Sequence, residues 1–364
     1  MKHVLNSLRL PKLSLALFIL TLILTVLGSI FVLEASAAES LNTFGNQYVL
    51  LKQHLIGLGI GMVGLGVGIF LPHKFWIKVS PFLFILSIVL LLLVFVPGIG
   101  LRLNGARRWI SILGLTIQPV EFLKFSLSAF YARWLSYHQR FGPFLFVTGA
   151  AALLILLQPD LGSTLLVVSL ATCLYFLAGG HLKNILITLV VGIPLVLALI
   201  FTSSYRLNRL KTFLDPQSDP LGSSFQIRQI TLALGRGGLV GQGLGNSSQK
   251  FAYIPEASSD SIFAIVAEEL GFVGSSLIII LFVSFLSLGF KIVNEVKEKD
   301  LRLLGLGCLV WISLQTLFNL GAVAALIPLT GMPLPFFSYG RSSQVMVFLA
   351  TGYIIGLAKQ ADSK

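Results

Sequence analysis

Two oppositely charged residues interrupt an apolar stretch and are the first candidates for chemistry in this sequence. Glu121 and Lys124 lie three positions apart, so on a helix they share one face and can form an ion pair. The pair could satisfy itself inside a bundle of helices, or Lys124 could face a cavity and bind a substrate anion. Because charge inside an apolar segment is costly and usually functional, both residues are candidates for substrate binding.

Carboxylates stand at two further breaks between apolar stretches. Asp160 could cap the helix that follows it, with Ser163 in the first turn of that helix. Asp260 directly precedes another apolar stretch, where Ser258 or Ser259 could be the cap and the helix N-terminus would favour negative charge. Both carboxylates therefore have a structural interpretation beside a functional one.

Paired arginines lie between two apolar stretches, next to an aromatic residue. Arg107 and Arg108 precede Trp109, a residue type that is common at membrane interfaces. Such arginines could simply contact the phosphates of lipid headgroups. A guanidinium group also binds phosphate through two parallel hydrogen bonds, so the pair could instead form a phosphate clamp.

The longest polar segment covers residues 204–260 and is rich in glycine between residues 235 and 245. Glycine permits positive φ and a close approach of the backbone. The pattern lacks the Lys-Ser/Thr ending of a phosphate-binding loop, so a flexible surface or re-entrant loop is the simpler interpretation. A segment this long without clear secondary structure is nevertheless usually functional.

Apolar stretches that position these residues make up most of the chain. Of 364 residues, 55% are hydrophobic and 11% are charged, whereas roughly 25% are charged in soluble domains. This composition excludes a soluble enzyme, a disordered protein and a nucleic-acid-binding module. A transmembrane helix needs about 20 apolar residues, and candidate stretches run approximately over residues 13–34, 50–72, 79–98, 118–136, 143–158, 162–180, 184–203, 261–290, 303–327 and 342–358.

These ten stretches predict an all-α integral membrane protein, organised as a single polytopic domain over residues 1–364. The segment 204–260 is then a long extracytoplasmic loop between transmembrane helices 7 and 8. With cytoplasmic termini, 14 of the 26 lysines and arginines lie inside and 11 outside, or 14 against 5 without the long loop. Short loops rich in Lys and Arg tend to stay in the cytoplasm, which favours this orientation. The cations left on the outer face indicate an anionic ligand or lipid headgroups.

Six motifs, in order along the chain, resemble the SEDS family (shape, elongation, division and sporulation proteins, the FtsW/RodA group). They are NGARRWI at 104–110, QPVEFLK at 118–124, QPDLGS at 158–163, FLDPQSDP at 213–220, PEASSDSIFAIVAEELGFVG at 255–274 and PLPFFSYGRSS at 333–343. The resemblance extends from about residue 14 to residue 358. Two details, VPGIG at 96–100 and GLGNSSQK at 243–250, look more like the FtsW branch than the RodA branch.

The resemblance implies a peptidoglycan glycosyltransferase that polymerises lipid II, an undecaprenyl-pyrophosphate-linked disaccharide peptide, on the outer face of the bacterial cytoplasmic (inner) membrane. It implies cytoplasmic termini, contact with membrane lipids and no nucleic acid. The implied partners are a class B penicillin-binding protein transpeptidase and other membrane proteins of division or elongation. The catalytic aspartate of the family corresponds to Asp260, and Lys124 and Asp160 match its polar cavity. Glu256 and Ser338 stand in matching motifs and are further candidates for substrate binding.

The expected reaction joins a sugar hydroxyl to the anomeric carbon of another lipid-linked glycan, with loss of the lipid pyrophosphate. Asp260 is our candidate for the general base, because a carboxylate near the hydroxyl can accept its proton. Lys124, Arg107 and Arg108 would stabilise the charge that develops on the pyrophosphate. A divalent cation such as Mg²⁺ or Mn²⁺ could share this work, although the sequence contains no dedicated metal site and establishes no cofactor.

Two alternative functions use the same residues differently. A lipid II flippase predicts charges along a path through both leaflets, whereas these charges cluster near one face. A non-catalytic scaffold for a penicillin-binding protein leaves the charges inside apolar segments without a purpose.

The sequence also departs from the family pattern. Serines at positions 258, 259 and 261 replace the usual His-Thr before the aspartate and Phe after it. Arg341 follows Gly340 where the family has a second glycine, and Gln53 stands where it often has arginine. These changes concern the placement of substrate and leave the proposed catalytic carboxylate in place.

Overall fold

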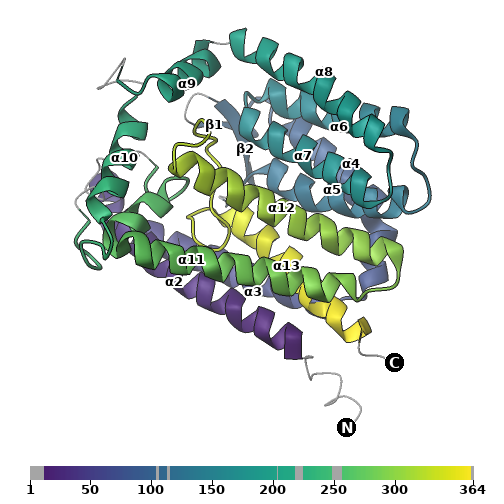
Figure 1. The fold of residues 1–364 in the computed structure, drawn as a ribbon, viewed down its shortest axis with the longest axis horizontal. Helices are drawn as coiled ribbons and strands as arrows, with labels where there is room; N and C mark the ends of the chain where they lie inside the picture. Colours follow the sequence, from purple (N-terminus) through teal and green to yellow (C-terminus); the bar gives the residue numbers. More distant parts are fainter. Residues whose placement is uncertain are drawn as a thin grey trace.

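A computed structural model describes residues 12–103, 106–112, 115–202, 204–217, 224–247 and 256–361. Every one of the ten apolar stretches coincides with a helix (Figure 1). These helices are α2 (Lys12–Phe44), α3 (Val49–Phe70), α4 (His73–Leu93), α5 (Pro119–Leu135), α6 (Phe141–Leu157), α7 (Leu161–Leu177), α8 (Leu182–Phe201), α11 (Ile262–Asn294), α12 (Lys299–Val323) and α13 (Arg341–Ala361).

The helical membrane fold predicted from composition is confirmed. Within the described residues, α2, α3, α4, α11 and α12 are long and apolar enough to cross a membrane. The number of ten membrane crossings stays a prediction. The start of α2 and the end of α13 lie at the same end of the bundle (Figure 1), as an even number of crossings requires.

The segment 204–260 contains two helices that we did not expect. These are α9 (Ser204–Leu214) and α10 (Phe225–Gly237), which lie at the end of the bundle opposite the chain ends (Figure 1). Ile227, Ile230 and Ala233 recur every three residues and are buried, so α10 has one apolar face. The expectation of a segment without clear secondary structure is therefore wrong for these residues.

A small antiparallel sheet lies at that same end and was also missed. Its strands, in the order β1 (Gly100–Leu103), β2 (Ala106–Ile112) and β3 (Leu115–Ile117), connect α4 to α5. The register shifts between β1 and β2, because Arg102 pairs with Arg107 whereas Leu101 pairs with Trp109. The extra residue in this bulge is Arg108, and bulges commonly redirect a side chain.

Glycines allow α3 and α13 to pack closely along their length. The Cβ of a larger residue at Gly68 would lie 2.6 Å from the Leu349 carbonyl oxygen, and one at Gly61 would lie 3.3 Å from the Phe348 ring. Small residues permit this kind of close approach between membrane helices. By contrast, none of the described side chains of α8 is buried, and α8 lies at the edge of the bundle (Figure 1).

Candidate functional site

The proposed catalytic carboxylate lies in a turn where three parts of the fold meet. Asp260 is half-buried and comes two residues before the start of α11. The Asn319 side chain, on α12, donates hydrogen bonds to the Asp260 carbonyl at 2.7 Å and to the Met332 carbonyl at 2.8 Å. Asn319 therefore fixes the aspartate against the connection between α12 and α13.

The capping roles suggested for the neighbouring serines are wrong. Ser261, not Ser258 or Ser259, precedes the first residue of α11, and it makes no side-chain cap. The Ser258 hydroxyl bonds Glu39 at 3.4 Å and the Ser259 hydroxyl bonds Glu256 at 2.9 Å. Asp260 thus lies outside the helix, where its carboxylate is not used as a cap.

Desolvation raises the pKa of Asp260 to about 7, and repulsion by Glu256 acts in the same direction. The positive charge of Arg209 and a hydrogen bond with Ser261 oppose this shift of the pKa. A carboxyl group with a pKa near 7 changes its protonation state under ordinary conditions, as a general base must.

A break in α11 explains the role of the glycine-rich segment. Gly271 has a φ of 66°, so the helix is interrupted there. The carbonyls of Glu268 and Glu269 accept hydrogen bonds from the amides of Gln242 and Gly243, both at 3.0 Å. On the other side of the break, the amides of 272 and 273 donate to the carbonyls of 238 and 239, at 2.9 and 3.0 Å. The segment 238–243 thus holds together the two parts of the helix that follows Asp260.

Close packing in this region requires glycine. Gly241 has a φ of +80°, and a Cβ at that position would overlap the Glu269 carbonyl. The Glu268 and Glu269 side chains are both fully buried beside the same segment, where Ser247 bonds the Glu268 carboxylate and Arg236 lies 3.9 Å from it. The glycines therefore have a structural role. This agrees with the sequence, which lacks the Lys-Ser/Thr ending of a phosphate-binding loop.

Lys124 and Glu121 form the predicted ion pair in the first turns of α5. Their charged atoms are 2.7 Å apart, and the Lys124 ammonium also donates to Gln315 Oε1 at 2.8 Å. The ammonium lies 5.4 Å from the centre of the Trp311 ring, a favourable cation–π geometry. Lys124 is only 1% exposed, and its ammonium already has a carboxylate and an amide oxygen as partners, so an anion could reach Lys124 only if the pair opened. Substrate binding by Glu121 and Lys124 stays a prediction.

Asp160 caps α7 as expected and also lies near an arginine. Its carboxylate accepts hydrogen bonds from the Ser163 amide at 3.0 Å and the Ser163 hydroxyl at 2.9 Å. Arg108 lies 3.9 Å from the same carboxylate and donates to the carbonyls of Gln158 and Pro159, at 3.2 and 2.5 Å. The bulge in β2 thus directs Arg108 to the start of α7.

A larger cavity of about 310 Å³ lies beside this arginine, between α7, α8, α9 and the connection from α12 to α13. Three arginines line it, namely Arg108, Arg206 and Arg209, and most of the remaining lining is apolar, including Leu165 and Ile200. We had not singled out Arg206 and Arg209 from the sequence. Their separation by three positions next to an apolar stretch would have been the signal.

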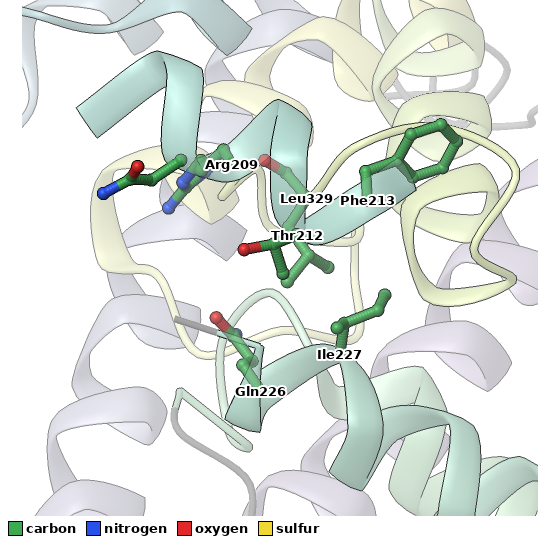
Figure 2. Close-up of a pocket in the computed structure, with 7 residues that line it drawn as sticks. Arg209, Thr212, Phe213, Gln226, Ile227 and Leu329 are labelled. Atoms are coloured by element: carbon green, nitrogen blue, oxygen red, sulfur yellow. Dashed lines mark hydrogen bonds between the residues drawn. The ribbon is translucent and has the colours of Figure 1, made fainter. Parts of the chain in front are cut away.

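A smaller cavity of about 250 Å³ lies between α9, α10 and the same connection (Figure 2). Arg209 and Leu329 line both cavities and so form their shared wall, and the Arg209 guanidinium donates to the Leu329 carbonyl at 2.6 Å. Gln226 reaches up from α10 toward α9 in Figure 2 and donates to the Ser261 hydroxyl at 3.2 Å. This cavity is therefore adjacent to the turn that carries Asp260.

The remaining candidates lie apart from both cavities. Arg107 and Glu256 are exposed, and only Arg108 of the arginine pair lines the larger cavity. Ser338 is buried in the connection between α12 and α13, where its hydroxyl accepts a hydrogen bond from the Leu334 amide at 2.7 Å. Within the described residues no group of three or more His, Cys, Asp and Glu side chains is arranged to hold a metal ion.

Comparison with known families identifies the chain. The FtsW, RodA and SpoVE family, described as "Cell cycle protein", matches residues 14–363. The chain belongs to this family.

The sequences of individual relatives align with nearly the whole length of this FtsW/RodA/SpoVE family member. Stage V sporulation protein E of Bacillus subtilis is 37% identical over 353 residues, which are 95% of this chain and 96% of that protein. A protein of Coxiella burnetii named "Probable peptidoglycan glycosyltransferase FtsW" is 38% identical over 360 residues, with 95% and 96% coverage.

Solved structures of similar proteins share the fold. A chain from the structure titled "Structural coordination of polymerization and crosslinking by a peptidoglycan synthase complex" has a TM-score of 0.80 at 26% identity, covering 98% of this chain and all of that one. The rod shape determining protein RodA of Thermus thermophilus has a TM-score of 0.72 at 25% identity, covering 99% of this family member. The helical membrane architecture is therefore that of the family.

Proposed function

We propose that this protein is a peptidoglycan glycosyltransferase that polymerises lipid II on the outer face of the cytoplasmic membrane, with both termini in the cytoplasm. Relatives that are about a third identical carry the name "Probable peptidoglycan glycosyltransferase FtsW". The observation that carries the proposal is the position of Asp260. Its pKa of about 7 suits a general base, and the smaller cavity beside it shares Arg209 with a larger, arginine-lined cavity.

In the proposed reaction, Asp260 accepts the proton of an acceptor sugar hydroxyl while the hydroxyl oxygen bonds the anomeric carbon of the donor glycan. The bond from that carbon to the lipid pyrophosphate breaks, and the pyrophosphate leaves with the electron pair. Arg108, Arg206 and Arg209 stabilise its negative charge from the wall of the larger cavity. The apolar part of that cavity accommodates the lipid chain.

Two further residues that the sequence suggested as substrate-binding candidates, Asp160 and Lys124, have secondary roles in the proposed reaction. Asp160 orients Arg108, with which it forms a 3.9 Å ion pair. Lys124 contacts substrate only when it separates from Glu121, because the closed pair has no net charge. A divalent cation such as Mg²⁺ or Mn²⁺ could neutralise the pyrophosphate further, without a dedicated protein site.

We place the protein in cell division, with elongation as the alternative process, and expect a class B penicillin-binding protein as its partner. A structural neighbour comes from a study titled as a peptidoglycan synthase complex, which is consistent with such a partner. Other membrane proteins of division or elongation would join the assembly.

The distribution of buried charge argues against a flippase. In the described residues, the buried acidic and lysine side chains lie within the first six residues of α5, within the first eight residues of α11 and at the cap of α7. These positions lie on the side of the bundle that carries the sheet, α9 and α10. A path for a charged headgroup through both leaflets would need buried charged side chains at the opposite end as well.

The variant Asp260→Asn tests the proposal. The protein is co-purified with its class B partner and supplied with lipid II in liposomes, and the length of the glycan product is measured on gels. The substitution removes the base but keeps the shape, so polymer should disappear while folding and membrane insertion persist. Asp300→Asn, at the opposite end of the bundle, should leave synthesis unchanged because asparagine keeps the oxygen that caps Leu301. Full polymer from Asp260→Asn, or none from the wild-type complex, contradicts the proposal.

A further inference from the structure

The two cavities that meet at Arg209 are lined by different kinds of side chain, so each suits a different part of one ligand. We propose that the smaller cavity is a carbohydrate subsite that binds the sugar next to the pyrophosphate of the lipid-linked donor. This inference rests on the proposed glycosyl transfer and specifies how its donor is bound.

The lining of the smaller cavity suits a sugar ring. Asn208 and Gln226 supply amides and Thr212 supplies a hydroxyl, and these groups can both donate and accept hydrogen bonds. Phe213 and Ile227 add apolar surface from the same two helices. Amino-sugar rings present hydroxyl and acetamido groups at their edges and C–H groups on their faces, so they match this mixture.

The size of the cavity limits what it can hold. At about 250 Å³ it lies just below the roughly 300–1,000 Å³ of pockets that enclose whole drug-sized ligands. One sugar ring is therefore a better match than the complete disaccharide peptide. The rest of the headgroup would extend past the exposed Asn208 at the rim.

The order of groups along the site matches the order of groups in the ligand. The apolar part of the larger cavity leads to the shared wall at Arg209 and Leu329, which leads to the smaller cavity. In lipid II the prenyl chain leads to the pyrophosphate and then to the sugar. The anomeric carbon, which joins pyrophosphate to sugar, then lies at the shared wall.

A chain of two hydrogen bonds connects the smaller cavity, where the sugar would bind, to the proposed base. Gln226 of the smaller cavity donates to Ser261, whose hydroxyl lies 3.4 Å from Asp260 Oδ1. The Asp260 carboxylate also faces the connection between α12 and α13, since a Cβ at Gly331 would lie 3.8 Å from its Oδ2. A donor sugar in the smaller cavity is thereby held next to the carboxylate that would activate the acceptor.

The test uses Asn208→Leu and Thr212→Val, because neither side chain bonds the Asp260 turn in the described structure. Each variant leaves sugar polar groups unsatisfied, so KM for lipid II should rise by about tenfold. The value of kcat should change little, as expected when binding is lost equally from the ground and transition states. Gln139→Leu, at the opposite end of the bundle, is the matched control.

Direct binding separates the sugar from the lipid and the phosphates. Affinity for lipid II and for sugar-free undecaprenyl pyrophosphate would be measured for each variant in nanodiscs. We expect weaker binding of lipid II alone. Unchanged binding of both ligands, or equal loss for both, overturns the carbohydrate subsite.

The proposed function can fail separately from the subsite. If the wild-type complex makes no polymer, the glycosyltransferase proposal is wrong, and the two affinities still decide whether the cavity recognises the sugar. If the wild-type complex polymerises and both variants keep wild-type KM and binding, only the subsite is wrong.

Discussion

Lys124 and Asp260, two of the charged groups inside the described part of this protein, differ in how their charge is compensated. Lys124 has a carboxylate at 2.7 Å, an amide oxygen at 2.8 Å and the face of an indole ring. Asp260 forms no ion pair within the described residues, and the two charges that shift its pKa are Glu256, which raises it, and Arg209, which lowers it. The first centre contains a direct ion pair, in which Glu121 Oε1 is bonded and Glu121 Oε2 accepts no hydrogen bond within the described residues, whereas the second contains no opposite charge in direct contact.

This contrast separates a structural role from a chemical one. Removing one member of a buried ion pair leaves an uncompensated charge, so such a pair is held in its charged state. A carboxylate with a raised pKa beside a cavity can exchange a proton with a ligand, which is typical of functional sites. We therefore expect substitutions at the first centre to change stability and those at the second to change activity.

The largest effect expected from this comparison is on the stability of Lys124→Met. The substitution leaves the buried Glu121 carboxylate unpaired, which should lower the free energy of unfolding by about 3–5 kcal/mol. Unfolding in mixed detergent–SDS micelles measures this change. Adding Glu121→Gln removes the stranded charge and should restore most of the stability. A Lys124→Met protein of normal stability that cannot bind lipid II would make Lys124 a substrate contact after all.

A large loss of activity with a smaller loss of stability is expected for Gly241→Ala. The new Cβ would overlap the Glu269 carbonyl, so the segment 238–243 must move away from the break in α11. A displacement of about 1 Å can reduce catalysis on the order of 100-fold, and the rate of glycan synthesis measures it. Gly235→Ala is the control, because a Cβ there meets no atom within 4 Å. Wild-type rates from both variants would mean that the break does not position Asp260.

A moderate effect is expected in the pH dependence of Glu256→Gln. Only deprotonated Asp260 can act as base, so kcat/KM should rise as pH increases through about 7, the raised pKa of Asp260. Removing the repulsion by Glu256 lowers this pKa, and the rise should move to lower pH. Glu298→Gln, distant from the site, should leave the profile in place. If the rise in kcat/KM stays at the same pH, the charge of Glu256 does not influence the pKa of Asp260.

The sequence predicted the parts of this protein that depend on local pattern. Apolar stretches of suitable length became helices, and the separation of three residues between Glu121 and Lys124 produced their ion pair. The cap at Asp160 is also a local feature and was predicted. Each of these depends on residues within one turn or one helix.

The parts that were missed depend on contacts between distant segments. Gln315 reaches Lys124 across 191 positions, and Asn319 fixes Asp260 across 59 positions. The glycines of 238–243 acquire their function only because α11 is broken at Gly271, which no local pattern indicated. The short strands of the sheet likewise gave no sustained alternation to recognise.

The smallest effect is expected at Arg341, a residue that departs from the family pattern and links the sheet to α3. Its guanidinium donates to the Thr116 hydroxyl of β3 at 2.9 Å, and its side-chain stem packs against Gly57 of α3. Thr116 pairs with Ser111 of β2, the strand that carries Arg108.

Arg341→Met keeps the packing but removes this hydrogen bond, so KM for lipid II should rise by about two- to tenfold. Thr116→Val should have a similar effect. The double variant should be no worse than either single variant, because both remove the same bond. Strictly additive effects would mean that Arg341 acts on the substrate independently of the sheet. Arg341 would then join Arg108, Arg206 and Arg209 as an arginine that binds the pyrophosphate.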